Sequence, residues 1–303
     1  MRALRSATTA IVGAAALTLS MSMGATGAPG GGQGGGQDEA VAKHEAARTA
    51  AEQAAVRAYW TPERMRNAIP RELAMKEAKG RPGGGGSSSA EAVEVAPRPE
   101  LGKVFFTMGG SNYVCSGTAT ASTNGDVVTT AGHCLNEGPG GYASQFMFAP
   151  AYKDGATPYG QWVAESLVAP VAWAEQGDFN HDVGFAVMAE QGGQSLTDAV
   201  GEVPIAFDLG YDLVFDAFGY PAARPYDGTD LWRCSGTAGT DTRGTTDHRL
   251  PCSMTGGSSG GGWITDGVLN SVNSFGYRGE KDVMYGPYFG TVEQAVYTEA
   301  QTS

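Results

Sequence analysis

The chain has 303 residues, of which 41% are hydrophobic and 17% are charged, values that suit a globular protein and exclude wholesale disorder. Glycine is unusually common at 46 residues and lacks the every-third-residue period of collagen, which favours a fold with many turns. The formal net charge is −12, and residues 101–303 carry 22 Asp and Glu against 8 Lys and Arg. So acidic a region argues against binding to nucleic acid or to an anionic membrane surface.

The first 28 residues have the order of a secretory signal peptide. Arg2 and Arg5 give a positive start, Ala10 to Met23 is an apolar run, and small residues continue to Ala28. This order is typical of an export signal that is later removed. The run is rich in Ala, Gly and Ser, which argues against a membrane span. We therefore expect a secreted, extracellular protein with no membrane attachment after signal cleavage.

Residues 29–98 are predicted to be a linker followed by a helical segment. Residues 29–37 contain mostly Gly and Gln and have little capacity to pack. Residues 38–79 are rich in Ala, Glu, Arg and Lys, which favours helix, and Thr61–Pro62 indicates a break followed by a new helical turn. Residues 80–89 are rich in Gly and Ser, as flexible connections are.

Two roles fit this helical segment. It is either a pro-segment that is removed after export or a simple spacer. Long-range β pairing is slow, so a secreted β-rich protein benefits from a segment that assists folding or delays activity. This reasoning favours a pro-segment, with the mature domain, residues 99–303, beginning near Arg98 to Lys103.

From about residue 101 the pattern changes to short strands. These runs are rich in β-branched and aromatic residues and are mostly separated by Gly, Pro, Asp or Asn, which favours an antiparallel barrel or sandwich. Long helical patterns between strands are absent, which argues against a parallel βαβ sheet. Only residues 291–300 are predicted as a helix, because their apolar positions share one face. The predicted strands are Lys103–Thr107, Tyr113–Thr118, Asp126–Thr130, Gln145–Ala149, Trp162–Val168, Val183–Met188, Leu213–Phe218, Leu231–Gly236, Gly262–Ile264, Leu269–Phe275 and Val283–Gly290.

Four cysteines are present, and an even number in an exported chain indicates two disulfides. Four cysteines allow three pairings, of which we favour the nearest neighbours, Cys115 with Cys134 and Cys234 with Cys252. No two of them form a C-x-x-C pair, which argues against a structural zinc site.

Three local clusters carry residues suited to catalysis. His133 lies in the sequence T-A-G-H-C after an apolar strand, Asp182 precedes another apolar strand, and Ser259 lies in a glycine run. A serine hydroxyl needs an adjacent base, and an imidazole base needs an acceptor on its other nitrogen. The glycines let the backbone N–H groups of Gly257 and Ser259 converge on one point, where they could hold an oxyanion.

Competing residues are less suitable. The motif around His133 sets it apart from the other three histidines, His44, His181 and His248. Asp182 is preferred to Asp178 because it directly precedes a predicted buried strand. Ser258 also lies in a Gly-x-Ser-x-Gly pattern, which suggests an α/β-hydrolase esterase. That fold needs a histidine after its serine, and none follows residue 248.

The chain resembles the trypsin-like (chymotrypsin-fold) serine peptidases, particularly secreted bacterial members, over about residues 101–303. Thr130–Cys134 matches the histidine motif of that family, Cys115–Thr118 its C-x-G-T strand, Gly257–Gly261 its G-D-S-G-G motif and Val272–Gly276 its V-S-W-G strand. The resemblance implies an all-β fold of two packed antiparallel β-barrels with a short C-terminal helix. It also implies a disulfide between the first two cysteines.

The resemblance further implies the roles of single residues. His133 would be the general base and then the general acid, Asp182 would orient it, and Ser259 would form an acyl-enzyme while a peptide bond is hydrolysed. Ser253, six residues before Ser259, would lie at the base of the primary substrate pocket, and the cleft would be lined by Ser274, Phe275 and Gly276.

Two departures from the family pattern are present. Ser258 replaces the aspartate before the nucleophile and Gly262 replaces a proline, so activation through an ion pair of that aspartate with a new N-terminus is not expected. Ser253 is not a carboxylate and Asn273 replaces the histidine of glutamyl-specific relatives, which leaves small or apolar side chains as the expected substrates.

The expected protein is therefore a monomeric serine endopeptidase with no metal and no organic cofactor. Its expected partners are protein or peptide substrates and its own pro-segment. The alternative is a catalytically inactive trypsin-fold protein that only binds its partners.

Overall fold

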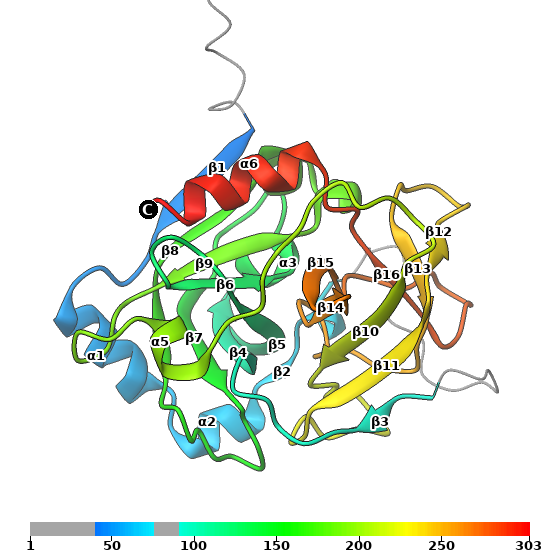
Figure 1. Ribbon diagram of the computed structural model, residues 1–303. Helices are drawn as coiled ribbons and strands as arrows, with labels where there is room; N and C mark the ends of the chain where they lie inside the picture. Colours follow the sequence, from blue (N-terminus) through cyan, green and yellow to red (C-terminus); the bar gives the residue numbers. More distant parts are fainter. Residues whose placement is uncertain (1–39, 76–90) are drawn as a thin grey trace, which may run out of the picture. The chain divides into compact units, whose positions relative to one another are not determined.

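Six strands of the first half of the molecule close into an antiparallel barrel (Figure 1). The structure, a computed structural model, describes residues 40–75 and 91–303, which belong to one unit. In pairing order the barrel strands are β4 (Leu101–Met108), β5 (Ser111–Thr120), β6 (Val127–Thr130), β9 (Gly184–Met188), β8 (Trp162–Pro170) and β7 (Ser144–Pro150), which pairs back to β4. Val104 of β4 lies opposite Cys115 and Phe148, and all three side chains are buried in the barrel.

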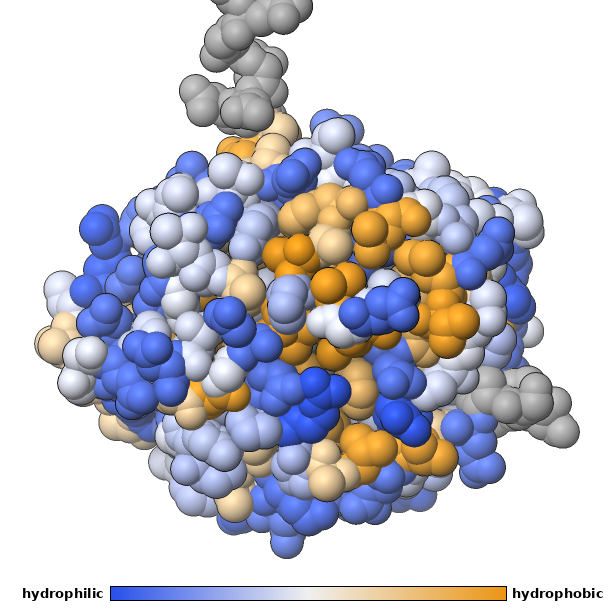
Figure 2. Space-filling model, in the orientation of Figure 1, coloured by the Kyte–Doolittle hydropathy of each residue, from blue (hydrophilic) through white to orange (hydrophobic). Residues whose placement is uncertain are grey.

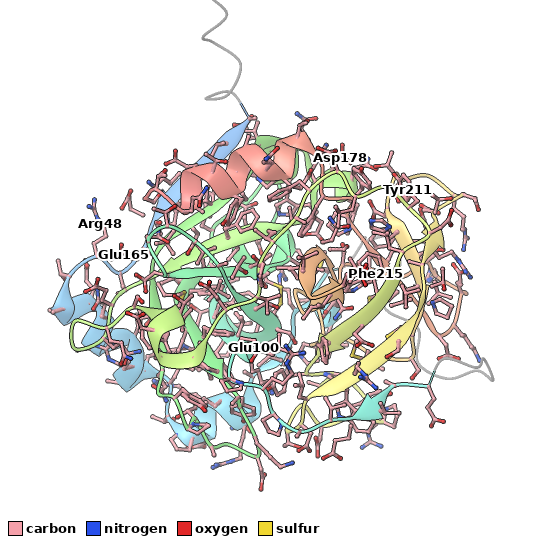
Figure 3. All side chains as sticks on the ribbon, in the orientation of Figure 1. Arg48, Glu100, Glu165, Asp178, Tyr211 and Phe215 are labelled. Atoms are coloured by element: carbon pink, nitrogen blue, oxygen red, sulfur yellow. A yellow bond between two sulfur atoms is a disulfide. The ribbon has the colours of Figure 1, made fainter. Side chains whose placement is uncertain are left out.

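The second half contains two further antiparallel sheets. One consists of β15 (Val268–Val272), β14 (Gly262–Thr265), β10 (Val214–Gly219), β11 (Trp232–Thr237) and β3 (Val93–Glu94). The other consists of β12 (Gly239–Thr240), β13 (His248–Pro251) and β16 (Val283–Gly286). Phe215 of β10, labelled in Figure 3, is buried with Trp263, Leu250 and Met284 in the core of this half.

All eleven predicted strands overlap observed strands, which confirms the predicted all-β architecture. Strand β13 was not predicted, because its sequence His-Arg-Leu-Pro lacks a clear alternation of apolar and polar residues.

Short helices connect the strands, and a longer one ends the chain. They are α3 (Gly132–Leu135), α4 (Val171–Gln176), η2 (Phe179–His181), α5 (Leu196–Val200) and α6 (Thr291–Ala300). The bounds of α6 are those predicted, and its Val296 and Ala300 are buried in the core of the first barrel. Figure 1 shows α6 lying over β8 and β9.

The segment before the barrel packs on the barrel. It consists of β1 (Val41–Glu45), α1 (Ala50–Tyr59), α2 (Pro62–Asn67), β2 (Ile69–Pro70) and the 3₁₀ turn η1 (Arg71–Leu73). Thr61 caps α2 through its side chain, and Pro62 lies in the first turn, as the sequence predicted.

The helix predicted over 38–79 is wrong at Ile69–Pro70, which form β2, and at Val41–Glu45. Val41–Glu45 form β1, which pairs residue by residue with Ser166–Pro170 of β8. Strand β7 pairs only with Trp162 and Val163, at the start of β8. The backbone hydrogen-bonding groups on that edge of Ser166–Pro170 are therefore available to β1. Pairing of five residues with an existing sheet outweighs a weak helix propensity.

Two findings concern the predicted domain boundaries. The predicted signal peptide (1–28), the predicted linker (29–37) and the Gly/Ser stretch (80–89) lie outside the described residues. Val93 and Glu94 of β3 pair with β11, and the Val95 amide donates to the Leu231 carbonyl at 2.9 Å. Residues 93–95 are thus built into the five-stranded sheet, ahead of the mature start predicted at residue 99.

The described surface is mixed in polarity. Figure 2 shows hydrophobic residues gathered over the region where Figure 1 draws β10, β14 and β15. Val214, the first residue of β10, is 65% exposed. Within residues 40–75 and 91–303, no helix has the length and apolar character needed to cross a membrane.

Candidate active site

His133 and Asp182 are brought together by two paired strands. His133 lies in α3, directly after β6, and Asp182 directly precedes Val183 and β9. Strands β6 and β9 are antiparallel neighbours with Thr130 opposite Gly184, so the residues that follow one and precede the other meet at one end. Both side chains are buried there.

The Asp182 carboxylate accepts three hydrogen bonds. Its Oδ1 accepts from the backbone N–H of His133 at 2.8 Å. Its Oδ2 accepts from His133 Nδ1 at 2.8 Å and from the Ser274 hydroxyl. Because the carboxylate can only accept, it fixes the proton on Nδ1 and leaves Nε2 with a free lone pair.

The electrostatic setting of His133 favours its protonated form. Burial alone would lower the pKa of His133, but the adjacent Asp182 carboxylate and its hydrogen bond outweigh burial and raise it. The negative charge of Glu72 adds to this effect, and Arg71 opposes it. Nε2 is buried and has no hydrogen-bond partner among the described residues. This imidazole is therefore set up to take a proton at Nε2.

Ser259 lies in a tight loop before β14 and is buried. Gly260, the next residue, has φ of +79°, and a Cβ there would lie 2.0 Å from Thr130 Oγ1 and 2.5 Å from the Ser116 carbonyl. Only glycine fits this combination of backbone angle and space. The Ser116 amide donates to the Ser259 carbonyl at 2.7 Å, which ties the loop to β5 of the first barrel.

The Gly257 amide points toward the same place as the Ser259 hydroxyl. The Gly256 carbonyl accepts from Ala222 N at 2.7 Å and Ala223 N at 3.1 Å, which turns the following N–H of Gly257 the other way. That N–H donates to the Glu72 carboxylate, at 3.2 Å from Oε1 and 3.0 Å from Oε2. The Ser259 hydroxyl donates to Glu72 Oε1. The Gly257 amide and the Ser259 hydroxyl thus converge on one carboxylate. An N–H group that faces a negative charge in this way is suited to be one of the donors of an oxyanion site.

Two side chains outside the predicted triad and oxyanion site support the serine loop. Asn273 Nδ2 donates to the carbonyls of Ser258 at 2.9 Å and Phe218 at 2.7 Å, and its Oδ1 accepts from Trp263 Nε1 at 2.7 Å. The Ser116 hydroxyl donates to the Gly257 carbonyl at 3.0 Å. No local pattern reveals these contacts, because each joins separate strands.

Glu72 was also missed by the sequence. It lies in η1, in the stretch predicted as helix, where one acid among many carries no signal.

Three of the four residues predicted to bind substrate make contacts within the protein, and the fourth, Gly276, is buried. The Ser253 hydroxyl accepts from Ala92 N at 2.9 Å and is 3.2 Å from the Tyr226 hydroxyl. Ser274 contacts Asp182, as described above. Phe275 pairs with Tyr285 through its backbone and stacks on its ring, and Gly276 is buried next to it.

The competing polar residues serve other contacts. His181 Nδ1 is 2.6 Å from Glu293, and this hydrogen bond raises the pKa of His181. Burial lowers the pKa of His248 to about 4, so it is neutral at pH 7. His44 stacks on Tyr142. Asp178, labelled in Figure 3, accepts from the Asn180 amide at the start of η2.

Both expected disulfides are present, Cys115–Cys134 and Cys234–Cys252. In the described part of the chain, Cys115, His133 and Cys134 form the one cluster with the spacing of metal ligands. Both sulfurs of this cluster are bonded to each other, so neither can act as a thiolate ligand. The residues therefore do not fit a metal site.

Several solved structures similar to this chain are proteases. Protease Anisep from Arthrobacter nicotinovorans is 49% identical, with 70% of this chain and 100% of that chain covered and a TM-score of 0.68. The thermostable serine protease AL20 from an extremophilic microorganism is 46% identical, with 68% and 98% covered and a TM-score of 0.66. A Glu endopeptidase is 19% identical, covers 70% of this chain and 97% of its own with a TM-score of 0.56, and shows the fold alone.

No protein-family model matches the chain. The extracellular metalloprotease of Bacillus subtilis is 34% identical over 74 residues, which are 24% of this chain and 23% of that protein. The chain thus spans less than a quarter of the length of this curated relative.

Proposed function

Because the chain belongs to the serine proteases of the chymotrypsin fold, we propose that it is a secreted endopeptidase that uses His133, Asp182 and Ser259 as its triad. Two observations support this proposal. The buried His133 imidazole is oriented by Asp182 at 2.8 Å, and the Glu72 carboxylate, whose charge also acts on His133, accepts from both the Ser259 hydroxyl and the Gly257 amide. A peptidase needs these groups together: a base, an orienting acid, a nucleophile and an oxyanion donor.

In the proposed first step, Ser259 Oγ attacks the carbonyl carbon of a substrate peptide bond. His133 Nε2 takes the hydroxyl proton as the new C–O bond forms, and the carbonyl electron pair moves onto oxygen. The amides of Gly257 and Ser259 stabilise that oxyanion. The Asp182 carboxylate stabilises the imidazolium, consistent with the raised pKa of His133.

The intermediate then collapses. The C–N bond breaks, the amine leaves with the proton from His133 Nε2, and the acyl group stays on Ser259. A water molecule next gives its proton to His133 and attacks the acyl carbon. The second tetrahedral intermediate releases the carboxylic acid, and the proton returns to Ser259. Ser253, Ser274, Phe275 and Gly276 are proposed to line the substrate cleft.

We also propose that residues 1–28 are an export signal and that the following segment is removed to give a monomeric mature enzyme. The incorporation of residues 93–95 into the second sheet supports a junction before Ala92 rather than at residue 98. Anisep, matched over its whole length, covers 70% of this chain, which is about the length of residues 92–303. The two disulfides fit an extracellular protein.

A fluorophosphonate probe tests the proposal, because it reacts with an activated serine. We expect it to label the processed wild-type protein at Ser259. We expect Ser259→Ala to lose both labelling and casein hydrolysis while keeping the thermal unfolding profile of wild type in the same processing state. Normal casein cleavage by the folded Ser259→Ala variant would refute the assignment. A folded, processed wild-type protein that never labels would instead support an inactive binding protein.

A further inference from the structure

The turn η1 crosses the proposed active site and places a carboxylate on its two key groups. Glu72 is 7% exposed, and its side chain accepts from the Gly257 amide and from the Ser259 hydroxyl. We propose that Glu72 is an internal latch that holds the unprocessed chain inactive by occupying the oxyanion site. This inference rests on the proposed function and explains how peptidase activity is inhibited before processing.

The carboxylate suits this position chemically. An oxyanion site offers N–H groups to a negatively charged oxygen, and the oxygens of an ionised carboxylate carry such charge. Hydrogen bonds to an ionised acceptor are about twice as strong as neutral ones. A neutral substrate carbonyl therefore competes poorly with Glu72 for the same donors.

The latch also diverts the nucleophile. The Ser259 hydroxyl has one proton, and it donates that proton to Glu72. His133 Nε2 has no partner among the described residues. With the serine proton directed at Glu72 rather than at His133, general-base activation of Ser259 cannot begin.

Neighbouring residues fix η1 in the site. Ile69 and Pro70 of β2 pair in parallel with Tyr113 and Val114 of β5. Arg71 lies over the Tyr113 ring at 5.0 Å and forms an ion pair with Glu137 at 3.3 Å. A Cβ on Gly256 would lie 3.1 Å from Glu72 Oε2 and 3.2 Å from Pro70. The turn fills the space beside the loop, so η1 and a substrate backbone exclude each other there.

A second anchor lies earlier in the segment, at Trp60. The Trp60 ring is 1% exposed and lies 5.5 Å from the Phe105 ring, and its Nε1 donates to the Gln145 carbonyl at 2.6 Å. Together with the pairing of β1 and β8, this contact holds Glu72 at a high effective concentration at the site.

No other described acid of the segment can replace Glu72. Glu45 pairs with Arg48 on the surface, Glu52 accepts from the Thr49 amide at the start of α1, and Glu63 is exposed on α2. Glu63 is therefore a matched control, since Glu63→Gln changes the same charge in the same segment without touching the site.

The test measures how fast the intact chain reacts with a fluorophosphonate probe, with mass spectrometry confirming that the labelled chain is uncleaved. We expect Glu72→Ala to react at least tenfold faster than wild type and Glu63→Gln to react at the wild-type rate. Glu72→Gln should be intermediate, because its amide oxygen is a weaker acceptor. Equal rates for wild type and all Glu72 variants would overturn the latch.

Two outcomes distinguish failure of the latch from failure of the proposed function. If every variant labels at the same rate, the latch is wrong but the serine peptidase assignment stands. If no variant labels even after prolonged exposure, although thermal unfolding shows that each is folded, the proposed function itself fails. Should Glu72→Ala not fold, the isosteric Glu72→Gln decides: wild-type labelling by that variant alone overturns the inference.

Discussion

Replacing Asp182 by Asn should abolish catalysis through the tautomer of His133 rather than through the fold. Both carboxylate oxygens accept: Oδ1 from the His133 backbone N–H, and Oδ2 from His133 Nδ1 and the Ser274 hydroxyl. An amide has only one acceptor oxygen. Its NH₂ group must therefore face either the His133 backbone N–H, or His133 Nδ1 together with the Ser274 hydroxyl. The backbone N–H cannot give up its proton, whereas an imidazole can move its proton to the other nitrogen. The NH₂ group should therefore face His133 Nδ1.

The consequence is a protonated Nε2 that can no longer accept the proton of Ser259. Loss of the correct tautomer lowers the rate of such a triad by about 10⁴-fold. Since each tenfold in rate corresponds to about 1.4 kcal/mol, the stabilisation of the transition state should fall by about 5 kcal/mol. Most hydrogen bonds survive the exchange, so the free energy of unfolding should change by only about 1–2 kcal/mol.

The assay is kcat/KM for peptide hydrolysis, with both proteins brought to the same processing state as checked by intact mass. Asp178→Asn is the matched control, because Asp178 caps η2 four residues away without contacting His133. We expect the control to stay within about threefold of wild type. An Asp182→Asn enzyme within tenfold of wild type would refute the tautomer reasoning, and so would a 10⁴-fold loss in the control.

Three further predictions concern stability, each measured in an inactive background to avoid autolysis. Gly260→Ala should cost about 3 kcal/mol or more, because φ is +79° and the new Cβ would lie 2.0 Å from a hydroxyl. Gly267→Ala, at φ +83° in open space, should cost only about 1 kcal/mol, and equal thermal shifts would contradict the proposed clash. Replacing both Cys115 and Cys134 by Ala opens a loop with a sequence separation of 19, which should cost about 3 kcal/mol and lower the calorimetric midpoint by about 6–12 °C. Burial raises the pKa of Asp126 from 3.8 to about 6. Between pH 3.8 and about 6 the folded protein therefore binds a proton at Asp126 that the unfolded chain has lost, so the free energy of unfolding falls as pH rises through this range. Asp126→Asn should therefore be more stable than wild type to urea at pH 7.5 but not at pH 4.

Much of the strand pattern and the triad candidates could be read from the sequence, because their signals are local. A strand such as Lys103–Thr107 shows itself through β-branched and aromatic residues, and its structure extends it only to Leu101–Met108. The glycines around Ser259 mark a backbone that other residues cannot adopt, and φ of +79° at Gly260 is the reason. Helix α6 follows from its apolar face alone.

Tertiary structure decided the rest, because the deciding contacts join distant residues. Val41–Glu45 has no strand signal of its own and becomes β1 because β8 offers it an open edge. Asn273 supports the serine loop only because three separate strands and loops meet around it.

Glu72 is the clearest case. It lies 187 positions before Ser259, in a stretch whose composition favours helix, and nothing near it in the chain marks it. The Glu72 carboxylate is held by the Ser259 hydroxyl and the Gly257 amide, which lie far from it in the sequence. Local sequence motifs therefore indicated which residues are candidates for catalysis, whereas only the tertiary structure showed which carboxylate contacts Ser259, because that contact joins residues far apart in the chain.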